Sequence, residues 1–228
     1  DSLEMVKTFE GLGKHVIDSS RSFYYREDKW LFYQVCLKHN LPTPTTHYIP
    51  RNISLSKGKL KEIFNEGPVV FKGIFSDTGR AVKRVMNYED ALKTVQELRK
   101  KIGFMPIVAQ KYIPHGTVSY RVTLAGDNII QSIVKYGKTW KEGKLFWKNE
   151  KYRRFKPNNK ISSLCKKTAK VFGLEWCGID LLKDMGNNWY LAEVNSCPSM
   201  DFVIKDMRRA NQQLANYLLR AHKNEIKK

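Results

Sequence analysis

Residues 177–198, CGIDLLKDMGNNWYLAEVNSCP, decide how the rest of this chain is interpreted. The pattern predicts two short strands, and the Gly and Asn residues between them favour a tight turn because they tolerate positive φ. Side chains two residues apart on a strand share a face, so Glu193 and Asn195 point the same way. Asp180 lies opposite them if the hairpin register allows, which would place two carboxylates and an amide oxygen on one surface.

Such a set of oxygen donors suits Mg²⁺. This ion prefers hard oxygen ligands, takes few of them from protein, and fills its remaining positions with water and phosphate oxygens. The alternative is an ordinary amphipathic hairpin whose polar face meets water. The hairpin leaves both interpretations open.

The composition limits the class of protein. The chain has 228 residues, of which 42% are hydrophobic, so it can bury a core of one large or two small domains and is not a disordered chain. No run of about 18 apolar residues is present, so we expect no membrane span. The first residue is Asp and no signal-peptide pattern follows, so we expect a fragment of a longer, cytoplasmic protein.

The cysteines are predicted to be reduced. Cys36, Cys165, Cys177 and Cys197 form no CxxC pair and have no His at metal-ligand spacing. Reduced thiols of a cytoplasmic protein are the interpretation, with a disulfide as the alternative.

The formal charge of +19 favours an anionic partner. Nucleic acid, phosphorylated small molecules and acidic peptides all qualify. A Lys-rich surface without any specific partner is the alternative, and charge alone does not choose among these.

Two lysines lie in predicted elements, one at a helix start and one in a strand. Asp28 is a candidate N-cap for a helix from Lys29 to about His39. Lys29 would then lie in the first turn, where the helix dipole disfavours a cation, so it is either a solvated lysine or one that faces an anion. Lys72 lies in the predicted strand that begins at Gly67.

A flexible turn follows that strand and contains Ser76, Thr78 and Gly79. Successive backbone N–H groups in such a turn can contact phosphate oxygens. The GxxxxGK[ST] pattern of a Walker loop is absent, so an ordinary hairpin turn is the alternative.

The central part of the chain predicts more strands. Residues 105–114 form a buried strand, and residues 119–136 form a hairpin around Gly126–Asp127, with Arg121 in its first strand. Helices are expected over residues 162–172, with Ser162 as cap, and over 204–226. The order of elements predicts an α+β fold with mostly antiparallel sheets.

Residues 135–160 are basic, aromatic and without regular pattern. They contain ten Lys and Arg against Glu142 and Glu150. Aromatic residues interleaved with cations can stack bases and bind phosphates, and a long solvated loop is the alternative. We expect a mobile lid in which Arg153 and Arg154 contact an anion.

Several segments in order resemble the ATP-grasp superfamily, in particular the RimK-type carboxylate–amine ligases. The resemblance covers about residues 5–203. Its pieces are REDKWLFYQVCLKHNLPTPTT, GPVVFKGIFSDTGRAV, IVAQKYI, SYRVTLAGDNII, GIDLLKD and YLAEVNSCP. The expected fold is therefore an ATP-grasp fold, in which two α/β subdomains grip ATP between them.

The resemblance also implies residue roles. Asp180, Glu193 and Asn195 would bind Mg²⁺, for which Mn²⁺ can substitute. Arg121 would contact phosphate or the acyl-phosphate intermediate, and Arg153 and Arg154 are expected to contact an anionic acceptor or the transferred phosphoryl group. ATP would be bound by Lys29, Lys72, Ser76, Thr78, Gly79 and the hinge Gln110, Lys111, Tyr112 and Ile113.

The sequence departs from the family pattern at three places. Lys111 stands where a Glu is common, and Gly73 stands where many relatives have Pro. The expected Asn…Arg-Gly-Gly pattern is not recognisable, and Asn149, Arg153 and Arg154 are its nearest candidates. This leaves the acceptor substrate open.

The resemblance implies an ATP-dependent ligase that forms an amide through an acyl-phosphate, on an anionic amino acid or acidic peptide. The alternatives are an ATP-grasp kinase that phosphorylates a small molecule, and a non-catalytic module that binds a nucleotide or nucleic acid. We expect residues 1–20 to be the tail of an N-terminal region, 21–115 the small subdomain and 116–228 the large one. No membrane partner is expected, and a homo-oligomer is compatible with the sequence.

Overall fold

A computed structural model describes residues 2–51, 55–75, 81–137, 139–141, 144–146 and 151–226. Its strands form two larger sheets and one small hairpin, and every pairing between the described strands is antiparallel. The expected α+β fold with antiparallel sheets is thereby confirmed.

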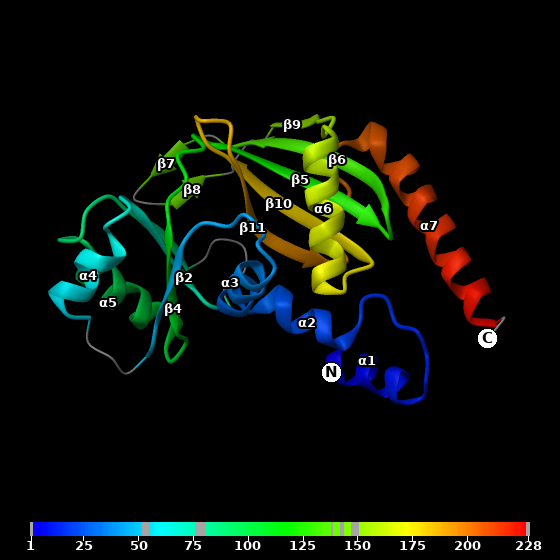
Figure 1. The fold of residues 1–228 in the computed structure, drawn as a ribbon, viewed down its shortest axis with the longest axis horizontal. Coiled ribbons are helices and arrows are strands. Elements are labelled where there is room, and N and C mark those ends of the chain that lie inside the picture. Colours follow the sequence, from blue (N-terminus) through cyan, green and yellow to red (C-terminus); the bar gives the residue numbers. More distant parts are fainter. Residues whose placement is uncertain are drawn as a thin grey trace.

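The first sheet has four strands in the order β1-β4-β2-β3. They are β1 (Thr46–Ile49), β2 (Val69–Gly73), β3 (Val82–Val85) and β4 (Ile107–Lys111). The helices α4 (Lys57–Ile63) and α5 (Ala91–Ile102) lie beside this sheet at the left of Figure 1. Phe71 and Val95 belong to the core between them.

The second sheet has five strands in the order β11-β10-β5-β6-β9. They are β5 (Val118–Ala125), β6 (Asn128–Tyr136), β9 (Lys151–Arg154), β10 (Trp176–Lys183) and β11 (Trp189–Ser196). Helix α6 (Asn159–Phe172) crosses one face of this sheet, and α7 (Ile204–Ile226) runs beside the sheet at the right of Figure 1. The predicted boundaries of α7 are confirmed.

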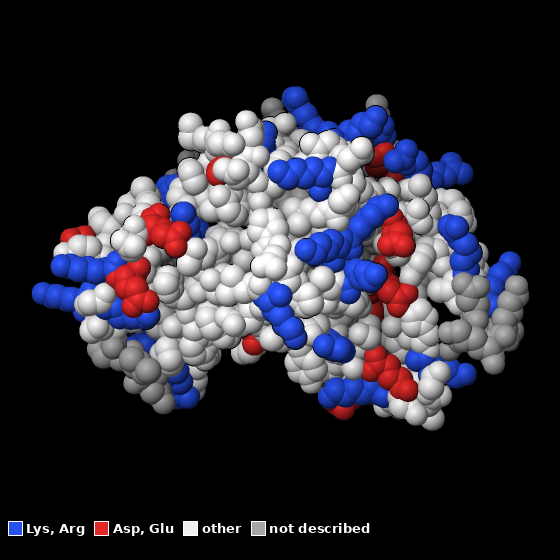
Figure 2. Space-filling model, viewed as in Figure 1, with Lys and Arg blue, Asp and Glu red and all other residues white. Residues whose placement is uncertain are grey.

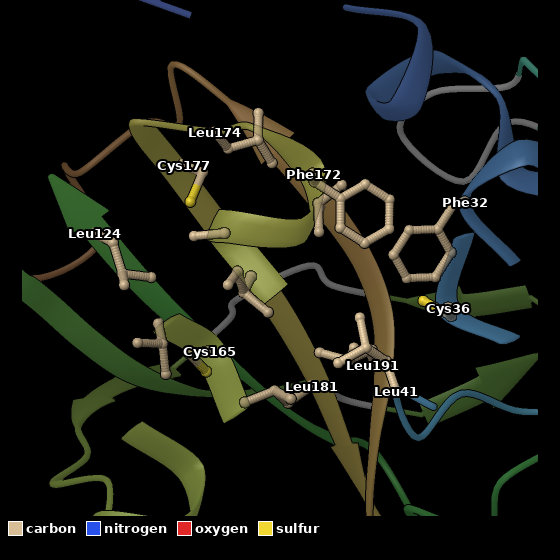
Figure 3. Close-up of a cluster of buried hydrophobic side chains, with 14 of the residues drawn as sticks. Phe32, Cys36, Leu41, Leu124, Cys165, Phe172, Leu174, Cys177, Leu181 and Leu191 are labelled. Atoms are coloured by element: carbon tan, nitrogen blue, oxygen red, sulfur yellow. The ribbon is translucent and has the colours of Figure 1, made fainter. Parts of the chain in front are cut away.

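Three helices precede the first sheet in the chain; the second and third contact β11 of the second sheet, and the third also contacts β1 of the first. They are α1 (Ser2–Gly11), α2 (Ser20–Glu27) and α3 (Lys29–Lys38). Phe32 and Cys36 of α3 belong to the core beneath α6 (Figure 3), and the Phe32 ring stacks on Phe172 at 5.3 Å between centroids. The backbone N–H of Leu191 donates to Pro42 O at 2.7 Å. The segment after α3 therefore passes directly from one sheet to the other.

The basic segment 135–160 is more regular than the sequence predicts. Residues 151–154 form the edge strand β9, paired with β6, and β7 (Thr139–Lys141) pairs with β8 (Lys144–Phe146). Strand β8 contacts β3 of the first sheet. The prediction of an irregular loop was wrong here, because pairing with β6 supplies an order that the charged, aromatic sequence does not indicate.

The start of α6 also differs from the prediction. The N-cap is Asn158, whose side chain accepts from Ile161 N–H at 3.0 Å, whereas the sequence favoured Ser162. At the other end, the predicted stop is confirmed, since Gly173 caps the helix in the left-handed conformation. The helix is therefore one turn longer at its N-terminus than the cap pattern suggested.

The cysteines of the chain are free: Cys36, Cys165 and Cys177 are buried, and Cys197 is exposed. Burial raises the pKa of the Cys36 and Cys165 thiols to about 12. Among the described residues, no helix is both long and apolar enough to span a membrane.

Candidate functional site

The hairpin β10–β11 brings Asp180 and Glu193 together. They are direct cross-strand partners, and Gly178 is the partner of Asn195. Leu181 pairs with Leu191, so Ala192 is an extra residue in β11. This bulge lets Leu191 point into the core while Glu193 shares the opposite face with Asp180, and bulges often re-aim side chains beside functional sites.

Arg121 on the neighbouring strand β5 forms an ion pair with Asp180. Its Nε and Nη2 donate to Asp180 Oδ1 and Oδ2 at 2.7 and 2.6 Å, a bidentate pair. Burial by itself would raise the pKa of Asp180, but Arg121 and Lys135 outweigh burial and hold that pKa below its usual value. Asp180 is therefore ionised and fixed in orientation.

Gly178 allows this pair to form beside the chain that follows β11. A Cβ at Gly178 would lie 2.9 Å from Pro198 Cβ and 3.4 Å from Arg121 Cδ. Such a short contact forces a shift of Pro198, so a glycine is required where Arg121 and Pro198 approach β10.

Lys72 reaches the same region from the first sheet. Its Nζ donates to Gln110 Oε1 at 2.7 Å, and Gln110 Nε2 donates to Thr46 Oγ1 at 3.1 Å. Burial, assisted by the nearby charge of Lys29, lowers the pKa of Lys72 to about 8, while Glu193 opposes this shift.

Lys29 is the first residue of α3, as predicted. Asp28 is confirmed as the N-cap, since its Oδ1 accepts from Trp30 and Leu31 N–H at 2.9 Å each. The backbone N–H of Lys29 donates to Ile74 O at 3.2 Å, which ties this helix start to the end of β2. The helix dipole disfavours a cation at this position, so Lys29 adds positive charge where the backbone N–H groups already favour an anion.

Charged side chains from the two sheets and from the start of α3 influence one another. Burial raises the pKa of Glu193, and the nearby charges of Lys29, Lys72 and Arg121 oppose that shift. Lys135 acts on Asp180, with its Nζ 3.6 Å from Asp180 Oδ1. We call this group the charged cluster, and its members are Lys29, Lys72, Glu193, Asp180, Arg121 and Lys135.

The hinge residues lie next to Lys72. Gln110 is the partner of Val70 on β2, and Ile113 is buried. The backbone N–H groups of Lys111 and Tyr112 donate within the protein, to Thr45 O and Pro68 O at 2.8 Å each. The Lys111 side chain pairs with Glu66 at 2.9 Å, so its ammonium group is engaged away from Lys72.

Other predicted site residues are placed differently or lie outside the description. Ser76, Thr78, Gly79 and Asn149 are outside the described residues. Arg154 pairs with Asp206 on α7. Arg153 lies over the Tyr136 ring, 5.8 Å from its centroid. Neighbours on a strand point to opposite faces, so the structure does not bring both arginines to one anion.

Sequence reasoning missed the contribution of Lys135 and Phe202 to this face. The Phe202 ring lies 5.4 Å from Arg121 Cζ and 5.3 Å from Lys135 Nζ. Lys135 was counted as part of a mobile basic segment. The period-2 alternation of the strand 128–136 could have placed it on a defined face.

The donor set fits a magnesium ion. Within the described part of the chain, no cluster of three or more His, Cys, Asp and Glu could hold a metal by itself. Asp180, Glu193 and Asn195 offer two carboxylates and one amide on one face, and Asn195 Nδ2 donates to Asp180 Oδ2 at 3.4 Å. A small set of hard oxygens, completed by phosphate oxygens and water, is what Mg²⁺ requires.

Much of the positive charge lies outside the charged cluster. Figure 2 shows Lys and Arg side chains over the region of α6, whose exposed lysines include Lys160, Lys166, Lys167 and Lys170. A cavity of ≈ 910 Å³ also lies elsewhere, between the segment around His15 and helix α7, and it shares no residue with the cluster.

Comparison with known proteins gives a family match over most of the chain. Residues 26–218 match the model described as "RimK-like ATP-grasp domain". A curated relative, "Probable alpha-L-glutamate ligase" from Haemophilus influenzae (strain PittEE), is 22% identical over 206 residues, which is 88% of this chain and 66% of the relative. The chain therefore spans just under two thirds of that relative.

Solved structures share the fold. The ATP-grasp ligase PsnB, complexed with a phosphomimetic variant of its minimal precursor, Mg and ADP, matches with a TM-score of 0.70 at 16% identity, over 96% of this chain and 66% of that one. D-alanine–D-alanine ligase from Bacillus anthracis complexed with ATP matches with a TM-score of 0.75 at 14% identity, over 97% and 76%.

Proposed function

This chain belongs to the RimK-like ATP-grasp family, and on that premise we propose that it is an ATP- and Mg²⁺-dependent carboxylate–amine ligase. The observation that supports this most is the charged cluster, in which Asp180 and Glu193 are direct partners and cations lie on both sides. The names of its relatives support the same reaction class, since they include glutamate and D-alanine ligases.

The proposed reaction has two balanced steps. A carboxylate oxygen of the acid substrate attacks the γ-phosphorus of ATP, the bond from that phosphorus to the β,γ-bridging oxygen breaks, and ADP leaves with the electron pair. The amine nitrogen then attacks the carbonyl carbon of the acyl-phosphate, the carbon–oxygen bond to phosphate breaks, and phosphate leaves. The nitrogen loses a proton to solvent as the amide forms.

The protein contributes positioning and electrostatic stabilisation in this proposal. Lys29 and Lys72 bind phosphate oxygens of ATP, together with Ser76, Thr78 and Gly79. The backbone N–H groups of Lys111 and Tyr112 donate hydrogen bonds within the protein. The hinge therefore binds adenine through its carbonyl groups and the Ile113 N–H. Arg121, held by Asp180, faces the transferred phosphoryl group.

Asp180, Glu193 and Asn195 would hold the magnesium ion. The ion supplies neutralisation of the phosphate oxygens and polarisation of the transferred phosphoryl group. Arg121 adds a second positive group on the same side, so the pair formed with Asp180 keeps its guanidinium in place for that role.

We propose an anionic amino acid or acidic peptide as substrate. The formal charge of +19 favours a negatively charged partner, and PsnB was solved with a precursor peptide. A nucleic acid would meet the same charge but would make no use of the charged cluster.

Product analysis tests the ligase proposal. The protein is incubated with Mg-ATP, an acid from a set of amino acids and acidic peptides, and a set of amines. The expected result is release of ADP and phosphate that depends on both partners, with a product whose mass equals acid plus amine minus water. A phosphorylated product without free phosphate would identify a kinase instead, and nucleotide binding without any turnover would indicate a binding module.

A further inference from the structure

We propose that Lys135 is a substrate-binding residue whose ammonium group binds the carboxylate of the acid, and that Phe202 holds it in place. This inference rests on the proposed ligase function and names a residue for the acid substrate. It starts from a basic side chain that the family resemblance assigns to no role.

Lys135 lies on the face of the second sheet that bears the charged cluster. Its side chain is 15% exposed, and its Nζ is 3.6 Å from Asp180 Oδ1. That distance is an ion pair but exceeds an ordinary hydrogen bond, whereas Arg121 donates to both carboxylate oxygens at 2.7 and 2.6 Å. Lys135 is therefore the more distant of the two cations that act on Asp180.

An aromatic wall fixes the position of this ammonium group. Phe202 lies 5.3 Å from Lys135 Nζ, and its ring centroid is 5.0 Å from that of Tyr152. Tyr152 on β9 is the direct cross-strand partner of Lys135. A cation near an aromatic face is attracted by the ring, so the wall orders the long Lys135 side chain before any substrate is bound.

The segment with Phe202 is anchored at both ends. Met200 O accepts from Gln131 Nε2 at 3.0 Å, and Arg154 pairs with the buried Asp206. Gln131 and Arg154 lie on β6 and β9 of the same sheet. Phe202 is therefore held against the sheet by its flanking residues.

Lys135 and the two lysines proposed to bind ATP act on different carboxylates of the charged cluster. Lys29 and Lys72 act on Glu193, whereas Lys135 acts on Asp180. If the two lysines bind the phosphates of ATP, Lys135 lies at the opposite end of the charged cluster. The attacking oxygen must approach the γ-phosphorus from the side opposite the leaving ADP, so the proposal puts the acid at the end of the charged cluster that contains Lys135.

The test separates binding of the acid from binding of ATP. Hydroxylamine replaces the unknown amine: its nitrogen attacks the carbonyl carbon of the acyl-phosphate, phosphate leaves, a proton passes to water, and a hydroxamate forms. The acids are L-glutamate, L-aspartate and tetra-glutamate. Rates are measured for the wild-type protein, Lys135→Met, Lys135→Arg and Phe202→Leu.

The proposal expects Lys135→Met to raise the KM for the acid by about tenfold or more, because a charge-assisted hydrogen bond is lost. The KM for ATP should stay within about twofold, since only one binding step is altered. Lys135→Arg should recover part of the acid affinity, and Phe202→Leu should raise the KM for the acid to a smaller extent. The matched control is Lys183→Met, because Lys183 lies over Trp189 at the end of β10.

Two results would overturn the proposal while the ligase function stands: an unchanged KM for the acid in Lys135→Met, or an equal rise in the KM for ATP. The second would make Lys135 a phosphate ligand. If the wild-type protein forms no hydroxamate from any of the acids, the ligase proposal fails, and the role of Lys135 fails with it.

Discussion

Asp180 is the residue that links the charges of this site. It pairs with Arg121 on one strand, faces Glu193 on the other, and attracts Lys135 from β6. Its carboxylate is nearly buried, so its charge costs desolvation energy unless cations compensate it. A buried, compensated carboxylate beside other charges is typical of a functional site.

Removal of one negative charge at the proposed metal site should abolish most turnover. We expect Asp180→Asn and Glu193→Gln each to lower the turnover number by about 100-fold or more, since each deletes a ligand charge without changing side-chain size. The measurement is amine-dependent ADP release at saturating Mg-ATP. Retained activity in both variants would place the metal elsewhere, and thermal unfolding of each variant checks that the fold is intact.

Lys72 gives a prediction with a pH dependence. Its pKa is lowered to about 8, so in the free protein Lys72 loses its proton as the pH rises through about 8. We expect the affinity for a non-hydrolysable ATP analogue to fall between pH 7 and pH 9, and calorimetric titration measures it. Lys72→Met should bind about tenfold or more weakly at pH 7, with a flatter pH profile.

The sign of the stability effect at Lys72 is opposite to that of a salt-bridged lysine. Because the folded-state pKa lies below the ordinary lysine value of 10.5, the unfolded chain binds more protons between about pH 8 and pH 10.5. This group therefore makes folding more favourable as the pH rises across that window. Lys72→Arg, which stays charged, is the control: a pH profile identical to wild type would exclude Lys72 as the titrating group.

At the scale of single elements, β11 and α6 show how local geometry positions the site. The extra residue Ala192 in β11 turns Glu193 to the face of Asp180, and α6 buries Cys165 and Phe172 against the opposite face of the sheet. The face that α6 covers is thus committed to the core, whereas the opposite face packs on α7 at the Ala125–Trp176 end and bears Asp180 and Glu193 further along the strands.

The sequence favoured Ser162 as the N-cap of α6, whereas the structure has Asn158 there, and two substitutions test which residue caps the helix. We expect Asn158→Ala to lower the free energy of unfolding by about 1 kcal/mol, because the Ile161 N–H loses its acceptor. Ser162→Ala should change it by less than about 0.5 kcal/mol, since that residue lies inside the helix. Urea unfolding measures both, and a larger loss for Ser162→Ala would contradict the observed cap.

For the whole molecule, the proposed nucleotide site joins two cores. Lys72 belongs to the first sheet, whereas Lys29 starts a helix that packs into the core of the second sheet, and Asp180 lies on β10 of that sheet. A ligand held by all three therefore contacts parts of the chain that belong to both cores. The strand β8, which contacts β3, forms another connection between them.

We therefore expect the ATP analogue with Mg²⁺ to stabilise the protein as a unit. At a ligand concentration of 100 times its Kd, linkage gives about 2.7 kcal/mol of added stability, seen as one unfolding transition at higher temperature. Lys72→Met and removal of Mg²⁺ by a chelator are the controls, and both should reduce the shift. A ligand-dependent shift in only one of two separate transitions would show that the nucleotide contacts a single core.

The residues alone predicted the features that depend on neighbours in sequence. The hairpin 177–198 with its three oxygen donors, the Asp28 cap, the lysine strand and the long final helix follow from periodicity and turn chemistry, which are local properties. The tertiary structure decided the remainder: the Arg121–Asp180 pair, the bulge at Ala192, the strand at residues 151–154, the opposite orientations of Arg153 and Arg154, and the wall that Phe202 forms beside Lys135. These features depend on which distant segments become neighbours, and strand pairing is governed by such contacts more than by intrinsic preference.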